Sequence, residues 1–185
     1  MLNTSVNIKE PGLNVLPPGV ERYIVSGGGL TGIQIFGDDE IEIINNEGNQ
    51  ICEISVFNKN GKSEPAILNL KDNKDVSEIK KILSKKDESC LIALRQLKKR
   101  NLDISKSRAS VVFDKYTNCG EKINIKSKDK CYCIFSAPGV EMLVHEQNPP
   151  TDLTIFVKRA KITKDKEHFL IPDPMFDPLN ETNID

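Results

Sequence analysis

The part of this chain that most constrains its fold is the alternating run over residues 27–59. Three glycines from Gly27 to Gly32 match the spacing G-x-G-x-x-G, which in a dinucleotide-binding fold places a pyrophosphate at a helix N-terminus. The runs that follow, Ile33-Gln34-Ile35 and Glu40-Ile41-Glu42-Ile43, alternate apolar with polar residues, as a half-buried strand does. Because the nucleotide fingerprint requires a helix directly after the glycines, the sequence favours a glycine-rich turn that leads into a β-meander.

Similar strand-like runs recur on both sides of the middle of the chain. We expect strands at 21–25, 30–36, 40–44 and 50–57, and again at 110–113, 122–125, 130–135, 141–144 and 153–158. Turns at Gly37-Asp38-Asp39 and at 45–49 would join the early strands as consecutive neighbours of one sheet.

The middle of the chain changes to a helical pattern. Asp75-Val76-Ser77-Glu78 has the form of a capping box, in which a side-chain oxygen and a carboxylate three residues later satisfy backbone N–H groups. A second helix at 90–99 would turn Leu91, Leu94 and Leu97 inward and stop at Asn101.

These elements predict an α+β, mainly β fold, with antiparallel sheets that form a sandwich or small barrel and a two-helix insertion at about 75–100. Prolines and glycines make residues 1–20 an irregular lead-in. We expect one β-rich domain over 21–170. Residues 171–185 form a proline-rich tail, or a linker to a downstream module that is missing here.

Composition excludes several classes of function. With 26 basic and 27 acidic residues the formal net charge is -1, so the sequence predicts no nucleic-acid partner. No apolar run approaches the roughly 18 residues of a membrane span, and the N-terminus lacks the pattern of a secretory signal. Five cysteines without regular spacing indicate free thiols in a reducing cytoplasm.

The candidate ligand-binding residues are His145, Glu146 and Asn58. His145 and Glu146 follow a predicted strand, where polar side chains that leave a sheet rim are well placed to bind a ligand. Asn58 begins a turn cluster after the strand at 50–57. The sequence contains no G-x-S-x-G, H-E-x-x-H or P-loop motif, so we predict no catalytic residue.

A metal site is a separate hypothesis. Cys131 and Cys133 lie on one face of a predicted strand, because alternate strand residues share a side. Together with Cys119 and His145 they could form a Cys3His zinc site, although the spacings differ from the usual C-x2-C pairs. The alternative is that Cys131 and Cys133 are small apolar residues of the core.

Several turn and strand motifs carry a family resemblance. They are PPGVERY at 17–23, GGG at 27–29, GD at 37–38, NNEGNQ at 45–50, SVFN at 55–58, SAPG at 136–139, QNPPTDL at 147–153, PDP at 172–174 and DPL at 177–179. This set resembles the N-terminal region of aminomethyltransferase-like proteins. Those proteins carry urea-carboxylase-associated-type β modules ahead of a glycine-cleavage T-protein-like, folate-binding catalytic region.

The resemblance implies an accessory, non-catalytic domain in a folate-dependent aminomethyltransferase system. Tetrahydrofolate would then belong to a downstream or partner region, in cis or in trans, and this chain would hold no cofactor of its own. A homo-oligomer is a further expectation. The alternative is a separate small-molecule-binding or metal-binding β-barrel module with its own activity.

Overall fold

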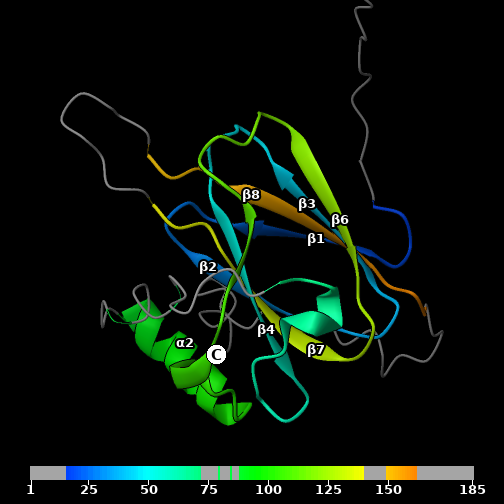
Figure 1. Cartoon of the computed structure of the whole chain (residues 1–185), viewed down its shortest axis with the longest axis vertical. Coiled ribbons are helices and arrows are strands. Elements are labelled where there is room, and N and C mark those ends of the chain that lie inside the picture. Colours follow the sequence, from blue (N-terminus) through cyan, green and yellow to red (C-terminus); the bar gives the residue numbers. More distant parts are fainter. Residues whose placement is uncertain (1–15, 72–78, 80–83, 85–87, 140–148, 162–185) are drawn as a thin grey trace, which may run out of the picture.

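The computed structural model describes residues 16–71, 79, 84, 88–139 and 149–161, and this part of the chain is dominated by eight strands (Figure 1). The strands are β1 (Val20–Val25), β2 (Leu30–Ile35), β3 (Glu40–Asn45), β4 (Cys52–Asn58), β5 (Ser110–Phe113), β6 (Glu121–Lys126), β7 (Cys131–Ser136) and β8 (Leu153–Lys158). The helical elements are the 3-10 turns η1 (Pro65–Leu68) and η2 (Ile104–Lys106) and the α-helix α2 (Glu88–Lys99). The helices of this described part are too short or too polar to cross a membrane.

The strands form two antiparallel four-stranded sheets, with the orders β1-β8-β3-β6 and β2-β7-β4-β5. Strand β1 pairs with β8, β2 with β7, β3 with β6 and β4 with β5, as if one long hairpin had been rolled up. This is the connectivity of a double-sheet jelly roll. The predicted fold class, mainly β with a sandwich of antiparallel sheets, is confirmed.

The predicted meander is wrong. Leu30 begins a strand and no helix follows Gly32, so the nucleotide alternative is excluded as well. The turn at 37–39 does not join two neighbours of one sheet, because β2 belongs to one sheet and β3 to the other. Alternation tells which face of a strand is buried but not which strand pairs with it.

Most of the expected strands lie within two residues of the observed ones. The strand expected at 141–144 lies outside the described residues, as does the capping box at 75–78. The lead-in over 1–15 and the tail over 171–185 also lie outside them.

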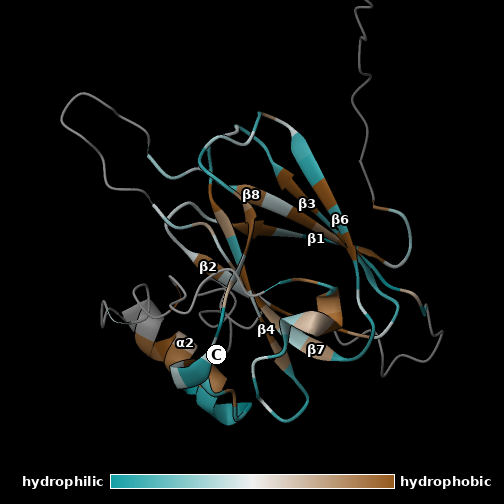
Figure 2. Ribbon diagram, viewed as in Figure 1, coloured by the Kyte–Doolittle hydropathy of each residue, from teal (hydrophilic) through white to brown (hydrophobic). Residues whose placement is uncertain are grey.

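The main core lies between the two sheets. Ile41 and Ile43 of β3 face Ile33 and Val56 of the other sheet across it, and all four side chains are fully buried. Figure 2 shows the hydrophobic colouring concentrated on the strands. The alternation that predicts Glu40 and Glu42 outward therefore assigns the faces of β3 correctly, since Glu40 is exposed and Glu42 is half-buried.

A second core lies under α2, on the outer face of the β2-β7-β4-β5 sheet. Ala93 and Leu97 of the helix pack with Phe57 and Ile134 of the strands. Leu91 was expected inward but is 46% exposed, because it lies one turn before the half-buried Leu94 at the rim of the apolar stripe. The helix ends as expected: Asn101 is left-handed, and Leu102 N–H donates to the carbonyl of Leu97 at 3.1 Å.

The inter-strand connections gather at two ends of the sandwich. We call the first the loop end; it consists of residues 26–29, 46–51, 114–120, 137–139 and 149–152. We call the second the arginine end; it consists of residues 36–39, 127–130 and 159–161.

Candidate functional site

The loop end brings together four of the runs that carry the family resemblance. Parts of the runs at 27–29, 45–50, 136–139 and 147–153 become neighbours there, although they are far apart in the sequence. The jelly-roll pairing causes this, because antiparallel partners place alternate connections at the same end.

Glycine is required where the connection between β1 and β2 meets the residues just before β8. The N–H of Gly27 donates to Asp152 Oδ1 at 2.9 Å, and a Cβ added to Gly27 would lie 2.1 Å from the carbonyl oxygen of Pro150. Gly28 has a positive φ of 76° and donates its N–H to the carbonyl of Ala137 at 2.7 Å. The glycines that mimic a phosphate loop in the sequence therefore allow two backbones to approach closely.

The side-chain amide of Gln50 connects three segments at this end. Its Nε2 donates to the carbonyls of Ile51 at 2.8 Å and Pro138 at 3.0 Å, and its Oε1 accepts from the N–H of Thr151 at 2.7 Å. Gln50 is 4% exposed. One uncharged side chain thus provides hydrogen-bond partners for backbone groups of three segments that are not paired with one another as strands.

Asparagines fix the remaining loops. Asn45 Nδ2 donates to the carbonyl of Gln50 at 2.8 Å, and Asn45 Oδ1 accepts from the N–H of Gly48 at 3.0 Å. Asn46 Nδ2 donates to the carbonyl of Asp152 at 3.2 Å and to Thr154 Oγ1 at 3.0 Å. These amides position backbone groups, and their chemistry is that of neutral hydrogen bonding.

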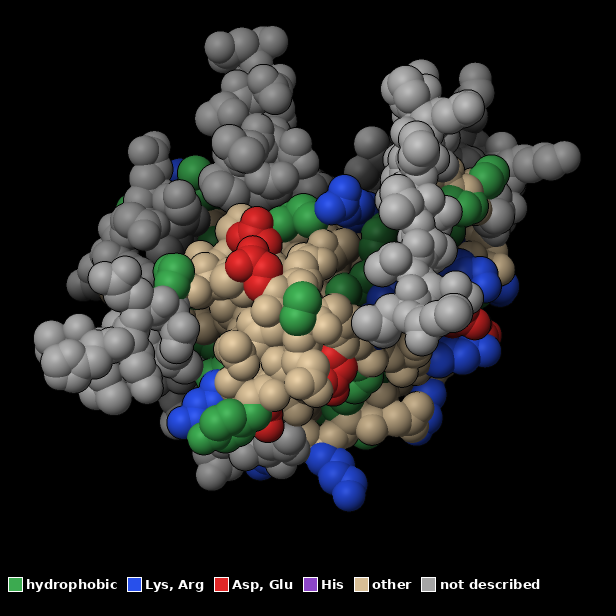
Figure 3. Space-filling view, turned by 90° about the horizontal axis from the view of Figure 1, so that it is seen from above, with side chains coloured by type: hydrophobic (Ala, Val, Ile, Leu, Met, Phe, Trp, Pro, Cys, Tyr) green, Lys and Arg blue, Asp and Glu red, His purple; other side chains and the backbone are tan. Residues whose placement is uncertain are grey.

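Two side chains at the loop end, Thr151 and Cys119, carry a polar or reactive group that the loop contacts above do not use. The hydroxyl of Thr151 is buried and has no hydrogen-bond partner among the residues that the structure describes, which is unusual for a buried polar atom. The thiol of Cys119 is exposed and contacts the carbonyl of Asn46 at 3.0 Å. Figure 3 looks down on the top of the molecule, where uncharged side chains and backbone predominate and a few acidic groups lie among them.

Of the ligand-binding residues expected from the sequence, His145 and Glu146 lie outside the described residues. The nearest described residues before and after them in the sequence, Gly139 and Pro149, belong to the loop end. Asn58 lies at the other end of the sandwich, where it pairs with Cys131 across β4 and β7. Its side chain shapes a turn, accepting from the N–H groups of Asn60 and Lys62.

The structure does not bring the candidate metal-binding cysteines together. Cys131 and Cys133 are buried in the sandwich core with their sulfurs 3.6 Å apart, while Cys119 lies exposed at the loop end. Burial raises the pKa of the Cys133 thiol, so the thiolate that a metal prefers is disfavoured there. Within the described ranges no three Cys, His, Asp or Glu side chains form a group that could hold a metal ion. The fourth proposed ligand, His145, is not among those residues.

The arginine end contains a charged network. Arg159 donates to Asp39 Oδ2 at 2.7 Å, to Glu21 through Nε and Nη2, and to the carbonyl of Gln34 at 2.9 Å. Burial alone lowers the pKa of Arg159, but hydrogen bonds to Glu21 and Asp39 raise it above its usual value. Burial and the hydrogen bond to Glu21 raise the pKa of Tyr23.

The charged groups of this network, Arg159, Asp39 and Glu21, form hydrogen bonds with one another. Asp39 also accepts from the backbone N–H groups of Phe36 and Ala160, so its carboxylate accepts three hydrogen bonds in all from the described residues. These hydrogen bonds join β1, the β2–β3 turn and the residues after β8. We therefore interpret the network as a structural clamp.

Sequence reasoning missed Gln50, Asn46 and Asp152 as residues of a shared surface. They occur in the runs NNEGNQ and QNPPTDL, which attract attention as turn signatures. Their convergence depends on the pairing of β3 with β8, over a hundred residues apart in the chain, and local patterns do not encode such a pairing.

No family model matches the chain. A curated relative is the trimethylamine-oxide aldolase of Ruegeria pomeroyi, which is 30% identical over 177 residues. The match covers 96% of this chain but 22% of the aldolase, so the chain spans about a fifth of the length of that relative.

Proposed function

We propose that this chain is an accessory, non-catalytic β-sandwich domain of a cytoplasmic, folate-dependent aminomethyltransferase system. The observation that carries the proposal is the alignment of nearly the whole chain with about a fifth of trimethylamine-oxide aldolase. A domain that corresponds to a minor share of a larger enzyme is expected to act with the rest of such an enzyme, in cis or in trans.

The chemistry of the described residues supports an accessory role. The loop end consists of backbone groups fixed by the neutral amides of Gln50, Asn45 and Asn46. At the arginine end, Arg159 and Asp39 bond to each other and to neighbouring groups in a structural clamp. A surface of turns suits recognition of another protein, and tetrahydrofolate would be bound by the partner region.

The first experiment measures the isolated chain. Trimethylamine oxide consumption is followed by proton NMR and tetrahydrofolate binding by calorimetry, with the Ruegeria aldolase as the positive control for turnover. We expect no turnover and no folate binding by the chain alone. Turnover by the purified chain would contradict the non-catalytic assignment.

The second experiment tests the partnership. A separately expressed T-protein-like folate-binding region is mixed with the chain and analysed by light scattering after size exclusion. A complex, or a change in the activity of the partner region, supports the proposal. Two proteins that migrate and act independently would contradict it, and light scattering of the chain alone reports whether it self-associates.

The unpartnered hydroxyl of Thr151 favours a second candidate, a small-molecule site at the loop end. Thermal shift with trimethylamine oxide and elemental analysis of untagged protein separate this candidate from the first. A ligand-dependent rise in melting temperature that Thr151→Val abolishes would favour the binding module. Unchanged melting and no stoichiometric metal would remove it.

A further inference from the structure

The strongest unassigned feature is a patch of positive charge that we call the basic pole, formed by residues 58–64 and 98–108. The first segment carries two lysines and one glutamate, and the second carries five basic residues and one aspartate. Their combined formal charge is therefore +5 in a chain whose net charge is -1.

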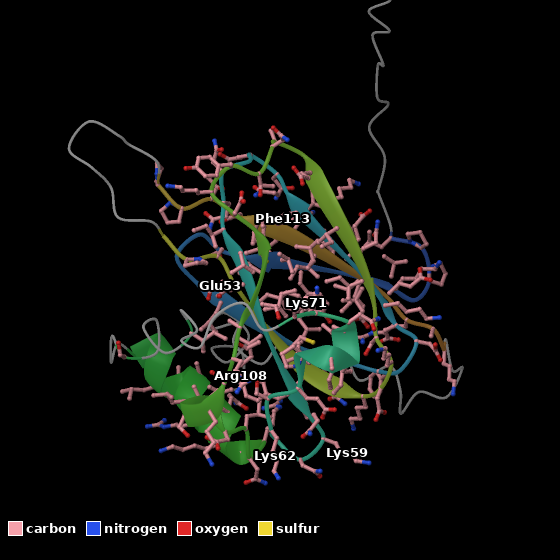
Figure 4. All side chains as sticks on the ribbon, in the orientation of Figure 1. Glu53, Lys59, Lys62, Lys71, Arg108 and Phe113 are labelled. Atoms are coloured by element: carbon pink, nitrogen blue, oxygen red, sulfur yellow. The ribbon has the colours of Figure 1, made fainter. Side chains whose placement is uncertain are left out.

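The two segments form one surface. The N–H of Asp103 donates to the carbonyl of Gly61 at 3.0 Å, and the N–H of Arg108 donates to Ser63 Oγ at 3.1 Å. A Cβ on Gly61 would lie 2.0 Å from the carbonyl oxygen of Asn101, so the backbones touch. Figure 4 shows Lys59 and Lys62 at the lower edge of the molecule and Arg108 above them, beside α2.

The stability of helix α2 explains only some of the basic residues of the pole. Lys98 and Lys99 occupy the last turn of α2, where cations interact favourably with the negative end of the helix dipole. Lys59 and Lys62 come from a different segment and have no such role; both are exposed. Within the pole, Asp103 is the acid that pairs with a lysine, Lys106, at 3.9 Å.

Three acidic residues of β3 and the turn before it already pair with lysines outside the basic pole. Glu42 pairs with Lys122, Glu40 with Lys158 and Asp38 with Lys126. Among the parts of the chain outside the described residues, 171–185 has the largest acidic excess. It carries Asp173, Asp177, Glu181 and Asp185 and no basic residue.

We propose that the basic pole is a docking surface for the acidic segment 171–185 of the same chain. Four carboxylates would offset most of the +5 charge of the pole, and a tether raises the local concentration of a segment to about the millimolar range. Exposed charge pairs are individually weak and are screened by salt, so the contact is reversible and depends on ionic strength.

The test uses the full chain and amine-specific acetylation read by mass spectrometry. The variant D173N, D177N, E181Q and D185N neutralises the segment without altering any described residue. At about 20 mM salt, where screening is weak, we expect Lys59, Lys62, Lys98 and Lys99 to react about threefold faster in the variant than in the natural chain. At about 0.5 M salt the difference should vanish.

Lys115 and Lys128 are matched controls, since both are exposed and lie outside the basic pole. Equal labelling of the pole lysines in both proteins would overturn the proposal, and so would an equal change at the control lysines. Protection that disappears on dilution would assign the contact to a second copy and would also overturn it. In a reciprocal test, K59E with K62E should lose the protection of Lys98 and Lys99, and adding D177K with E181K should restore it.

Discussion

The two ends of the sandwich are stabilised by different kinds of interaction, neutral hydrogen bonds at the loop end and ion pairs at the arginine end. The loop end relies on neutral amides and close backbone contacts, with Gln50 and Gly27 at its centre. The arginine end relies on one largely buried cation, Arg159, between Asp39 and Glu21. Losing one partner of a buried neutral hydrogen bond costs about 1–3 kcal/mol, whereas removing one partner of a buried ion pair leaves an uncompensated charge and costs about 3–5 kcal/mol.

This difference predicts which end is the more fragile. The arginine end should fail abruptly when its one cation is removed. The loop end should lose stability in smaller steps and should keep its fold.

The largest effect is expected at Arg159. Arg159→Met leaves Asp39, which is 2% exposed, without its cation, and should lower the free energy of unfolding by about 3–5 kcal/mol. Urea denaturation followed by circular dichroism measures the change. Adding Asp39→Asn should recover part of the loss, because the stranded charge is then removed; no recovery would contradict the charge argument.

A smaller effect is expected at Gly27. Gly27→Ala places a Cβ against the carbonyl of Pro150 and should cost about 1–3 kcal/mol through backbone displacement. Gly139→Ala is the matched control at the same end, because its added Cβ meets ordinary contacts at 3.6 Å or more. Thermal unfolding of both variants gives the comparison, and equal costs would show that crowding at Gly27 is unimportant.

The third prediction concerns alkaline pH at the arginine end. The raised pKa of Tyr23 means that its stabilising contribution is complete below about pH 10 and is lost as pH rises through the folded value. In this range the free energy of unfolding should fall by up to about 1.4 kcal/mol per pH unit for this group. Tyr23→Phe should flatten the slope, whereas Tyr116→Phe, at a 75% exposed site, should leave it unchanged.

The smallest effect is expected at Cys119. Cys119→Ser should change stability by less than about 0.5 kcal/mol, as is usual for an exposed site. Iodoacetamide should label Cys119 in the native protein and leave Cys52, Cys131 and Cys133 unmodified, because these three are buried. Peptide mapping reads the result, and labelling of Cys133 without denaturant would show that the core opens readily.

The sequence predicts the strands well because alternation and turn residues are local. Ile41 and Ile43 are buried and Asn101 ends α2, as their local patterns indicate. The pairing is a different matter. The alternation of apolar and polar residues in β2 would be the same whether it paired with β3 or with β7. The strand order of the two sheets therefore cannot be predicted from local sequence patterns.

The candidate site shows the same limit. His145 and Cys119 attract attention because of their side-chain chemistry, whereas Gln50 acts through backbone groups of Pro138 and Thr151. Such a residue can be recognised only after the topology has placed its partners beside it. Arg159 is similar, since Asp39 and Glu21 come from the opposite end of the sequence.

The nested pairing of β1 with β8 also has a consequence for biosynthesis. Strand β1 emerges from the ribosome long before its partner at 153–158 exists. At translation rates of about 5–20 residues per second, synthesis of the roughly 130 residues between the two strands takes about 6–26 s, during which β1 lacks its partner. Until β8 is available, the unpaired strand is exposed to pairing with other chains, so this long-range pairing makes folding slower and the nascent chain more prone to aggregation.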